Sequence, residues 1–260
     1  MNYRHIDFKT TEQTGILTIN RPKVLNALNS ETIAEIRSVL GEMRGNEDLR
    51  ALIITGAGEK AFAAGADIGE IESLGLKDGF DFLKAGQQMN HDIETLGKPT
   101  IAAVNGLALG GGCELALSCT LRLVSETAKF GLPELGLGVI PAYGGTQRLT
   151  RLIGKSRALW FILNGDFINA EQALEMGLAG AMVKPEALLE TALKIAGKIA
   201  AKAPLAVKMA LYAIHYGSEI NSDAGFVLEN ALANITLASE DKKEGIKAFL
   251  EKRKPDFKGE

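Results

Sequence analysis

The sequence is poor in the residues that build metal and cofactor centres. It has 3 histidines in 260 residues, and His5, His91 and His215 lie too far apart to match metal-ligand spacing. No GxxxxGK[ST] segment is present, and residues 56–61 (GAGEKA) lack the third glycine of a dinucleotide fingerprint. These absences exclude a P-loop nucleotide site. We therefore expect chemistry that uses neither a metal nor a redox cofactor.

A strong excess of charge is also missing. The net charge of −3 gives no electrostatic attraction to nucleic acid or to an anionic membrane. The first ten residues (MNYRHIDFKT) lack the apolar stretch of a signal peptide. Cys113 and Cys119 lie in one apolar stretch and form no CxxC pair, so we expect them to be buried and reduced. The composition thus predicts a cytoplasmic protein without nucleic acid or membrane partners.

Two carboxylates stand isolated in apolar, glycine-rich surroundings. Residues 99–121 hold one charge, Glu114, directly after Gly110–Gly112, and the polar residues in this stretch argue against a membrane span. Glu134 follows Pro133 in the segment FGLPELGLG. A carboxylate is rarely buried without a partner or a chemical role, so the pair suggests acid/base chemistry in a dry pocket. The structural alternatives are a buried ion pair for Glu114 and a helix cap for Glu134.

Small residues and glycines also form two candidate anion-binding turns. The segment 61–68 (AFAAGADI) and the cluster Gly110–Gly112 each allow close backbone approach. Together they could offer two backbone N–H groups to one oxyanion, with Gly111 at the start of a helix whose dipole favours negative charge. The simpler interpretations are a tight loop after the strand near 52–55 and close packing between a helix and a sheet.

Apolar periodicity predicts an α/β fold. Residues 16–19, 52–54, 101–104 and 121–123 have the composition of strands, and the runs at 52–54 and 101–104 are continuous, as in strands buried on both faces. Residues 30–48 have helical spacing after Asn29, and alternation of strands with helices favours a mostly parallel sheet. The second half is helical, with a capping box at Asn169 and Gln172 and apolar stripes in 189–199 and 228–235. No linker separates the halves, so these helices should pack on the sheet or on another subunit.

Segments spread over nearly the whole chain match a single family: 20–28 (NRPKVLNAL), 61–68, 102–106 (AAVNG), 109–115 (LGGGCEL), 130–134 (FGLPE), 144–149 (GGTQRL) and 251–255 (EKRKP). On these segments the sequence resembles the crotonase (enoyl-CoA hydratase/isomerase) family, and most closely its short-chain enoyl-CoA hydratases. The resemblance implies a spiral of ββα units that binds a coenzyme A thioester over residues 1–190. It implies a helical trimerisation region over residues 191–260, and a homotrimer or homohexamer.

The resemblance also implies roles for single residues. The backbone N–H groups of Ala66 and Gly111 would form an oxyanion hole for the thioester carbonyl, and Glu114 and Glu134 would be the catalytic pair. The expected substrate-binding residues are Lys23, Val24, Ala64, Ala66, Asp67, Ile68, Gly111, Phe249 and Lys252. Of these, Phe249 and Lys252 would lie in the C-terminal helix and reach the coenzyme A of a neighbouring subunit. The alternative is that the C-terminal segment, which is basic because it holds Lys252, Arg253, Lys254 and Lys258, is only a surface exposed to solvent.

The implied activity is that of an enoyl-CoA hydratase, a lyase of fatty acid metabolism and β-oxidation. It would add water reversibly and with syn geometry to a short trans-2-enoyl-CoA, giving a 3-hydroxyacyl-CoA, with coenzyme A as part of the substrate and no separate cofactor. One alternative is another crotonase reaction such as enoyl-CoA isomerisation, but relatives with that activity typically keep one carboxylate of the pair. Another is an RNA-binding relative, against which the acidic helix at 30–48 argues because it offers no basic stripe.

Overall fold

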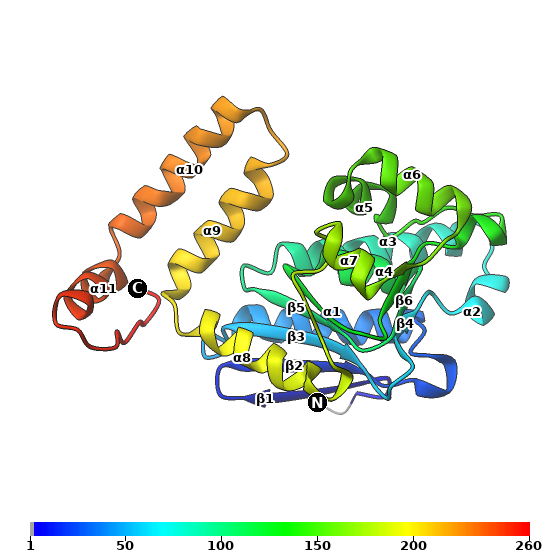
Figure 1. Ribbon diagram of the computed structural model, residues 1–260, viewed down its shortest axis with the longest axis horizontal. Coiled ribbons are helices and arrows are strands. Elements are labelled where there is room, and N and C mark those ends of the chain that lie inside the picture. Colours follow the sequence, from blue (N-terminus) through cyan, green and yellow to red (C-terminus); the bar gives the residue numbers. More distant parts are fainter. Residues whose placement is uncertain (1–2) are drawn as a thin grey trace.

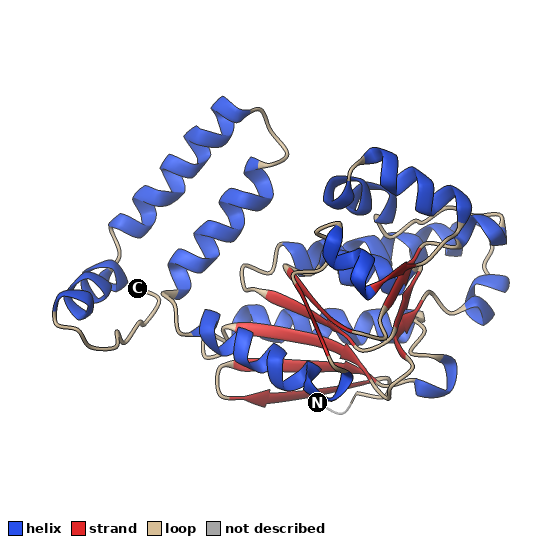
Figure 2. Cartoon of the chain, viewed as in Figure 1, coloured by secondary structure: helices blue, strands red, loops and turns tan. Residues whose placement is uncertain are grey.

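Two β-sheets form the framework of the protein (Figures 1 and 2). The computed structural model describes residues 3–260, so residues 1 and 2 of the expected core unit lie outside the described part. The larger sheet has the order β1-β2-β3-β5-β7-β10, and its pairs are parallel except β1 with β2. Its strands are β1 (Ile6–Thr11), β2 (Thr14–Ile19), β3 (Ala51–Gly56), β5 (Thr100–Val104), β7 (Leu121–Ser125) and β10 (Ala181–Val183). The four strands expected from the sequence are confirmed within this sheet.

Both faces of the larger sheet are covered, which explains its continuous apolar strands. Leu52 and Ile54 of β3 pack into one core cluster with α1 (Ser30–Gly45) and α3 (Leu76–Glu94). Ala51 and Ile53 pack into a second cluster with α8 (Leu188–Ala200). Successive side chains of a strand point to opposite faces, so a strand between two helical layers must be apolar at every position.

A second sheet was not expected from the sequence. It has the order β4-β6-β8-β9 and consists of β4 (Ala61–Ala64), β6 (Leu107–Leu109), β8 (Lys129–Gly131) and β9 (Ile168–Asn169). The interpretation of residues 61–68 as a loop is therefore wrong for residues 61–64, which form β4. Strands of two to four small residues are too short to show alternation, and their pairing depends on partners far away in the chain.

The remaining helices surround the second sheet or extend from the core. Those near the second sheet are η1 (Pro22–Val24), α2 (Ile68–Glu72), α4 (Gly111–Ser118), η2 (Glu134–Leu137), α5 (Gly145–Ile153), α6 (Lys155–Asn164) and α7 (Ala170–Glu175). Asn29 caps α1, and the capping box of Asn169 with Gln172 begins α7, both as the sequence predicts. Cys113 and Cys119 are buried and free, and burial raises the pKa of the Cys119 thiol to about 12.

The C-terminal helices project away from the two sheets (Figure 1). After η3 (Pro185–Ala187) and α8, the chain forms α9 (Pro204–Gly217), α10 (Ser222–Leu237) and α11 (Glu240–Leu250). The unit boundary expected at residue 190 falls inside α8, whose buried side chains pack on the sheet. None of the helices formed by residues 3–260 is long and apolar enough to cross a membrane.

Candidate active site

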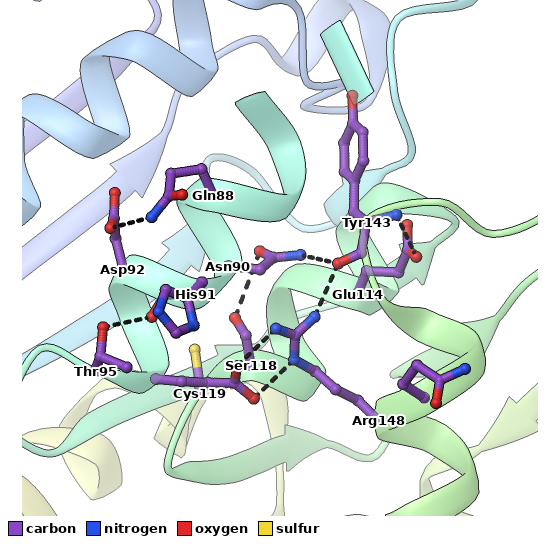
Figure 3. A network of polar contacts seen from close by, with 12 residues as sticks. Gln88, Asn90, His91, Asp92, Thr95, Glu114, Ser118, Cys119, Tyr143 and Arg148 are labelled. Carbon is purple, nitrogen blue, oxygen red and sulfur yellow. Dashed lines mark hydrogen bonds and ion pairs between the residues drawn. The ribbon is translucent and has the colours of Figure 1, made fainter. Parts of the chain in front are cut away.

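Glu114 is buried in the first turn of α4. Only 2% of its surface is exposed, and its Oε1 accepts hydrogen bonds from the backbone N–H groups of Tyr143 (2.8 Å; Figure 3) and Gly145 (2.7 Å). The nearby Arg148 is bound by two hydrogen bonds to Glu94 (2.7 and 2.6 Å). Within residues 3–260 Glu114 forms no ion pair, so the alternative of a structural salt bridge does not explain its burial.

Burial makes Glu114 a poised acid or base at neutral pH. Loss of solvent raises its pKa from 4.5 to about 7, and the negative charge of Glu134 adds to the rise. The two N–H donors and the positive charge of Arg148 act in the opposite direction. A carboxyl group with a pKa near 7 can both accept and donate a proton at neutral pH, which is what acid/base catalysis requires.

Glu134 lies beside Glu114, at the first position of η2. Its Oε1 would lie 3.1 Å from a Cβ atom built on Gly110, the residue that precedes α4. Its Oε2 is buried and has no hydrogen-bond partner among the residues that the structure describes. Burial raises the pKa of this carboxyl group as well. A carboxylate oxygen without a partner in a buried position is available to bind water or a substrate.

Two backbone N–H groups meet next to these carboxylates. Gly65 has φ 101°, and the chain after it pairs with Leu28: the Leu28 N–H donates to Gly65 O (2.8 Å) and the Asp67 N–H donates to Leu28 O (2.9 Å). The N–H of Ala66, which lies between these two bonds in the chain, donates to no acceptor among the described residues. The Gly111 N–H is the first of α4 and is also unused within the described chain. A Cβ atom built on Gly111 would lie 3.4 Å from the Ala66 nitrogen, so the two donors are close together.

The glycine cluster also serves packing, as its simpler interpretation holds. A Cβ atom on Gly112 would lie 1.9 Å from the carbonyl oxygen of Ala63, so α4 approaches β4 at a distance that only glycine allows. Gly110 adopts φ 49° at the turn from β6 into α4. The same glycines that permit this contact therefore place the start of α4 beside the Ala66 segment.

Several of the expected substrate-binding residues line the same region. The Ala64 N–H donates to Leu25 O (3.0 Å), which brings the end of β4 next to Lys23 and Val24 in η1. Lys23, Val24 and Ile68 are exposed. The Asp67 carboxylate pairs with Arg21 (2.8 Å) and caps α2 through the Gly69 N–H (3.2 Å), so its side chain is already engaged.

The structure does not bring Phe249 and Lys252 to this region. Both lie at the end of the projecting C-terminal helices, on the opposite side of the molecule from α2 (Figure 1). Phe249 is 82% exposed at the end of α11. The expectation that Lys252 is helical is wrong, because it follows the C-cap Glu251 and adopts φ 55°. Within one chain these two residues cannot contact a ligand held near Glu114.

Tyr143 and Gly145 were missed by the sequence interpretation, although they hold Glu114. The sequence analysis names residues 144–149 only as a segment shared with the family, and α5 begins at Gly145 within it. The additional signal is that Gly145 must be small: a Cβ atom there would lie 2.8 Å from Glu114 Cγ. No group of His, Cys, Asp and Glu side chains suited to hold a metal ion occurs in residues 3–260.

A separate cavity of about 210 Å³ lies near Pro99, which directly precedes β5, and near α9. It is rich in basic side chains, but two of them bind helix-terminal carbonyl groups. Lys98 Nζ donates to Met43 O (2.5 Å), and Arg50 donates to Ala200 O (3.1 Å). Cations at helix C-termini stabilise the helix dipole, so these contacts have a structural explanation and the catalytic groups are elsewhere.

Two N–H groups that are unused within the described chain, beside the buried Glu114 and the partly buried Glu134, define an enzyme site that can stabilise an oxyanion and move protons. The sequence model of the family "Enoyl-CoA hydratase/isomerase" matches residues 10–260, and the chain belongs to this family. It is 44% identical to the short-chain-enoyl-CoA hydratase of Clostridium acetobutylicum over 98% of this chain and 97% of that protein. It is also 44% identical to the crotonyl-CoA hydratase of Syntrophomonas wolfei over 99% of each chain. The crystal structure of an enoyl-CoA hydratase from Bacillus anthracis superposes with a TM-score of 0.97 at 38% identity, covering 99% of this chain and 100% of that chain.

Proposed function

We propose that the protein is an enoyl-CoA hydratase that acts on short trans-2-enoyl-CoA thioesters. It adds water reversibly across the conjugated double bond with syn geometry and forms a 3-hydroxyacyl-CoA. The observation that carries the proposal is the juxtaposition of Glu114 and Glu134 with the unused N–H groups of Ala66 and Gly111. The full-length similarity to relatives named as short-chain and crotonyl-CoA hydratases supports it.

The two N–H groups stabilise the charge that develops on the thioester oxygen. As water attacks C3, electron density moves through C2 to the carbonyl oxygen and gives an enolate-like anion. The Ala66 and Gly111 N–H groups donate to this oxygen, and the N-terminal end of α4 adds its dipole. Loss of one such donor typically costs about 3 kcal/mol of transition-state stabilisation.

The two carboxyl groups handle the water and the proton. Glu114 orients and helps to activate the water, whose oxygen forms the new bond to C3. Glu134, which has a buried oxygen without a partner in the described chain, exchanges the proton at C2. One proton leaves the water and one arrives at C2, so the reaction is balanced without an external oxidant or base. Isomerisation, in which a proton only moves between carbons, requires no second carboxylate to bind water.

The coenzyme A part of the substrate contacts the mouth of this site. We assign it to Lys23, Val24, Ala64, the backbone of Asp67 and Ile68, which lie together near η1 and α2. No metal or redox cofactor is part of this mechanism, and chelation is expected to leave activity intact. We place the enzyme in the cytoplasm, in line with its two free, buried cysteines.

A homotrimer or homohexamer completes the proposal. The projecting α9 and α10 and the loop between them expose several large apolar side chains that a neighbouring subunit can cover: Ile214, Ile220, Phe226, Val227, Ile235 and Leu237. In such an assembly Phe249 can stack near the adenine and Lys252 can meet a phosphate of the coenzyme A in a neighbouring site. Light scattering at micromolar concentration tests this point, and a monomer would contradict it.

Hydration of crotonyl-CoA by the purified protein, followed by loss of absorbance of the conjugated thioester, tests the proposed function. Glu114→Gln and Glu134→Gln should each lower kcat by several orders of magnitude while coenzyme A binding is retained. Glu35→Gln is the matched control and should leave the rate unchanged. It alters a carboxylate of α1 that accepts hydrogen bonds from the Arg4 and His5 backbone N–H groups. A near wild-type rate in either catalytic variant would show that its assigned role is wrong. A folded wild-type protein that hydrates no enoyl-CoA would refute the function.

A further inference from the structure

Tyr143 joins the catalytic carboxylate to the wall of the site. Its N–H donates to Glu114 Oε1 (2.8 Å), and its carbonyl oxygen accepts from Asn90 Nδ2 (3.0 Å) and Arg148 Nη1 (2.8 Å) (Figure 3). The residue is 2% exposed. Three hydrogen bonds therefore hold its backbone in place, and the direction in which its side chain leaves the backbone is set by the same bonds that hold the Glu114 carboxylate.

The ring of Tyr143 lies in a slot between α3 and α4. A Cβ atom built on Gly86 of α3 would come within 2.4 Å of the ring, and one on Gly111 of α4 would come within 3.1 Å. The Phe82 ring packs against it with the ring centroids 5.9 Å apart. Since the Gly111 position is also 3.4 Å from the Ala66 nitrogen, the edge of the ring borders the proposed oxyanion hole.

The hydroxyl group of Tyr143 has no structural role within the described chain. It is buried and has no hydrogen-bond partner among residues 3–260. Burial raises its pKa, and the charges of Glu114 and of Glu70 on α2 add to the rise, so the hydroxyl remains neutral. A buried hydroxyl without a partner is unfavourable for folding, whereas a phenylalanine ring would fill the same slot without this penalty. The ring, and not the hydroxyl group, is therefore the part of Tyr143 that fills this slot.

The position of the ring relative to the reacting atoms suggests what it does. With the thioester oxygen on the Ala66 and Gly111 N–H groups and C3 next to Glu114, the substrate would touch two residues, Gly111 and Glu114, that Tyr143 itself contacts. The fourth carbon of the acyl chain must then approach the ring. We propose that the Tyr143 ring forms the end wall of the acyl-binding space and restricts the enzyme to short enoyl chains. This inference rests on the proposed function.

Substitution of Tyr143 tests the end wall through the ratio of kcat/KM values for eight-carbon and four-carbon trans-2-enoyl-CoA substrates. Tyr143→Ala should raise this ratio roughly tenfold or more, because added methylene groups gain space. Tyr143→Phe keeps the ring and should keep the wild-type ratio. Phe161→Ala truncates a buried aromatic side chain of α6, away from the site, and is the matched control for lost packing; it should also keep the ratio.

The outcomes separate this inference from the proposed function. If the wild-type enzyme hydrates crotonyl-CoA but Tyr143→Ala lowers kcat/KM by the same factor for both substrates, the ring is only structural and the inference fails alone. If the wild type hydrates neither substrate, the proposed function fails. If Tyr143→Ala does not fold, Tyr143→Leu takes its place. Calorimetry on the wild type gives an independent measure: octanoyl-CoA should bind roughly tenfold more weakly than butyryl-CoA, and equal or tighter binding would overturn the inference.

Discussion

Replacement of the catalytic Glu114 by glutamine is expected to make the protein more stable above neutral pH while it abolishes activity. Burial raises the pKa of Glu114 from 4.5 to about 7, so its charged form is less favourable in the native protein than in the unfolded chain. A glutamine carries no charge. Its amide oxygen can still accept the hydrogen bonds that the Tyr143 and Gly145 N–H groups donate to Oε1. The substitution should therefore remove an electrostatic penalty and retain the local contacts.

The expected size of the effect depends on pH. Below the unfolded pKa of 4.5 both states are protonated, and the carboxyl group adds no pH-dependent term. As the pH rises from 4.5 to about 7, the unfolded chain releases a proton that the native protein retains, so the free energy of unfolding falls. Above pH 7 the loss levels off at roughly 3 kcal/mol. The advantage of Glu114→Gln should thus grow from near zero to roughly this value.

Equilibrium denaturation in urea from about pH 5 to about pH 9 measures this difference in the free energy of unfolding. The protein concentration is held fixed, because the stability of an oligomer depends on it. Glu35→Gln, which replaces a carboxylate of α1 outside the site, serves as the control. A difference between wild type and Glu114→Gln that stays constant with pH would refute the reasoning. A wild type that gains stability relative to the variant as pH rises would refute it more directly, because the sign would then be opposite.

Three further outcomes are expected. If Glu114 acts as a base, kcat/KM for crotonyl-CoA should rise with pH through about 7, and a flat profile would contradict that role. Gly112→Ala should lower the melting temperature strongly, because its Cβ would lie 1.9 Å from a carbonyl oxygen of β4; Gly45→Ala, whose Cβ meets nothing within 4 Å, is the control. Combined replacement of Phe249 and Lys252 by alanine should raise KM for coenzyme A thioesters more than it lowers kcat, whereas an unchanged KM in an intact oligomer would show that the C-terminus is only a solvated face.

Local features of the fold could be predicted because their causes are local. The continuous apolar runs at β3 and β5 follow from burial on both faces, and the caps at Asn29 and Asn169 follow from the side-chain acceptors that helix N-termini need. The isolation of Glu114 as a charge follows from its place in the apolar run of residues 99–121. Each of these properties depends on a window of a few residues.

The sequence by itself thus determined the strand–helix alternation and the two isolated carboxylates. The second sheet, the approach of Ala66 to Gly111 and the placement of the Tyr143 ring were decided only by the tertiary structure. These features join segments that are far apart in the chain, and their geometry depends on how closely glycines allow two elements to pack. A local pattern shows which face of an element is apolar, but it carries no information on which distant backbone will meet that face.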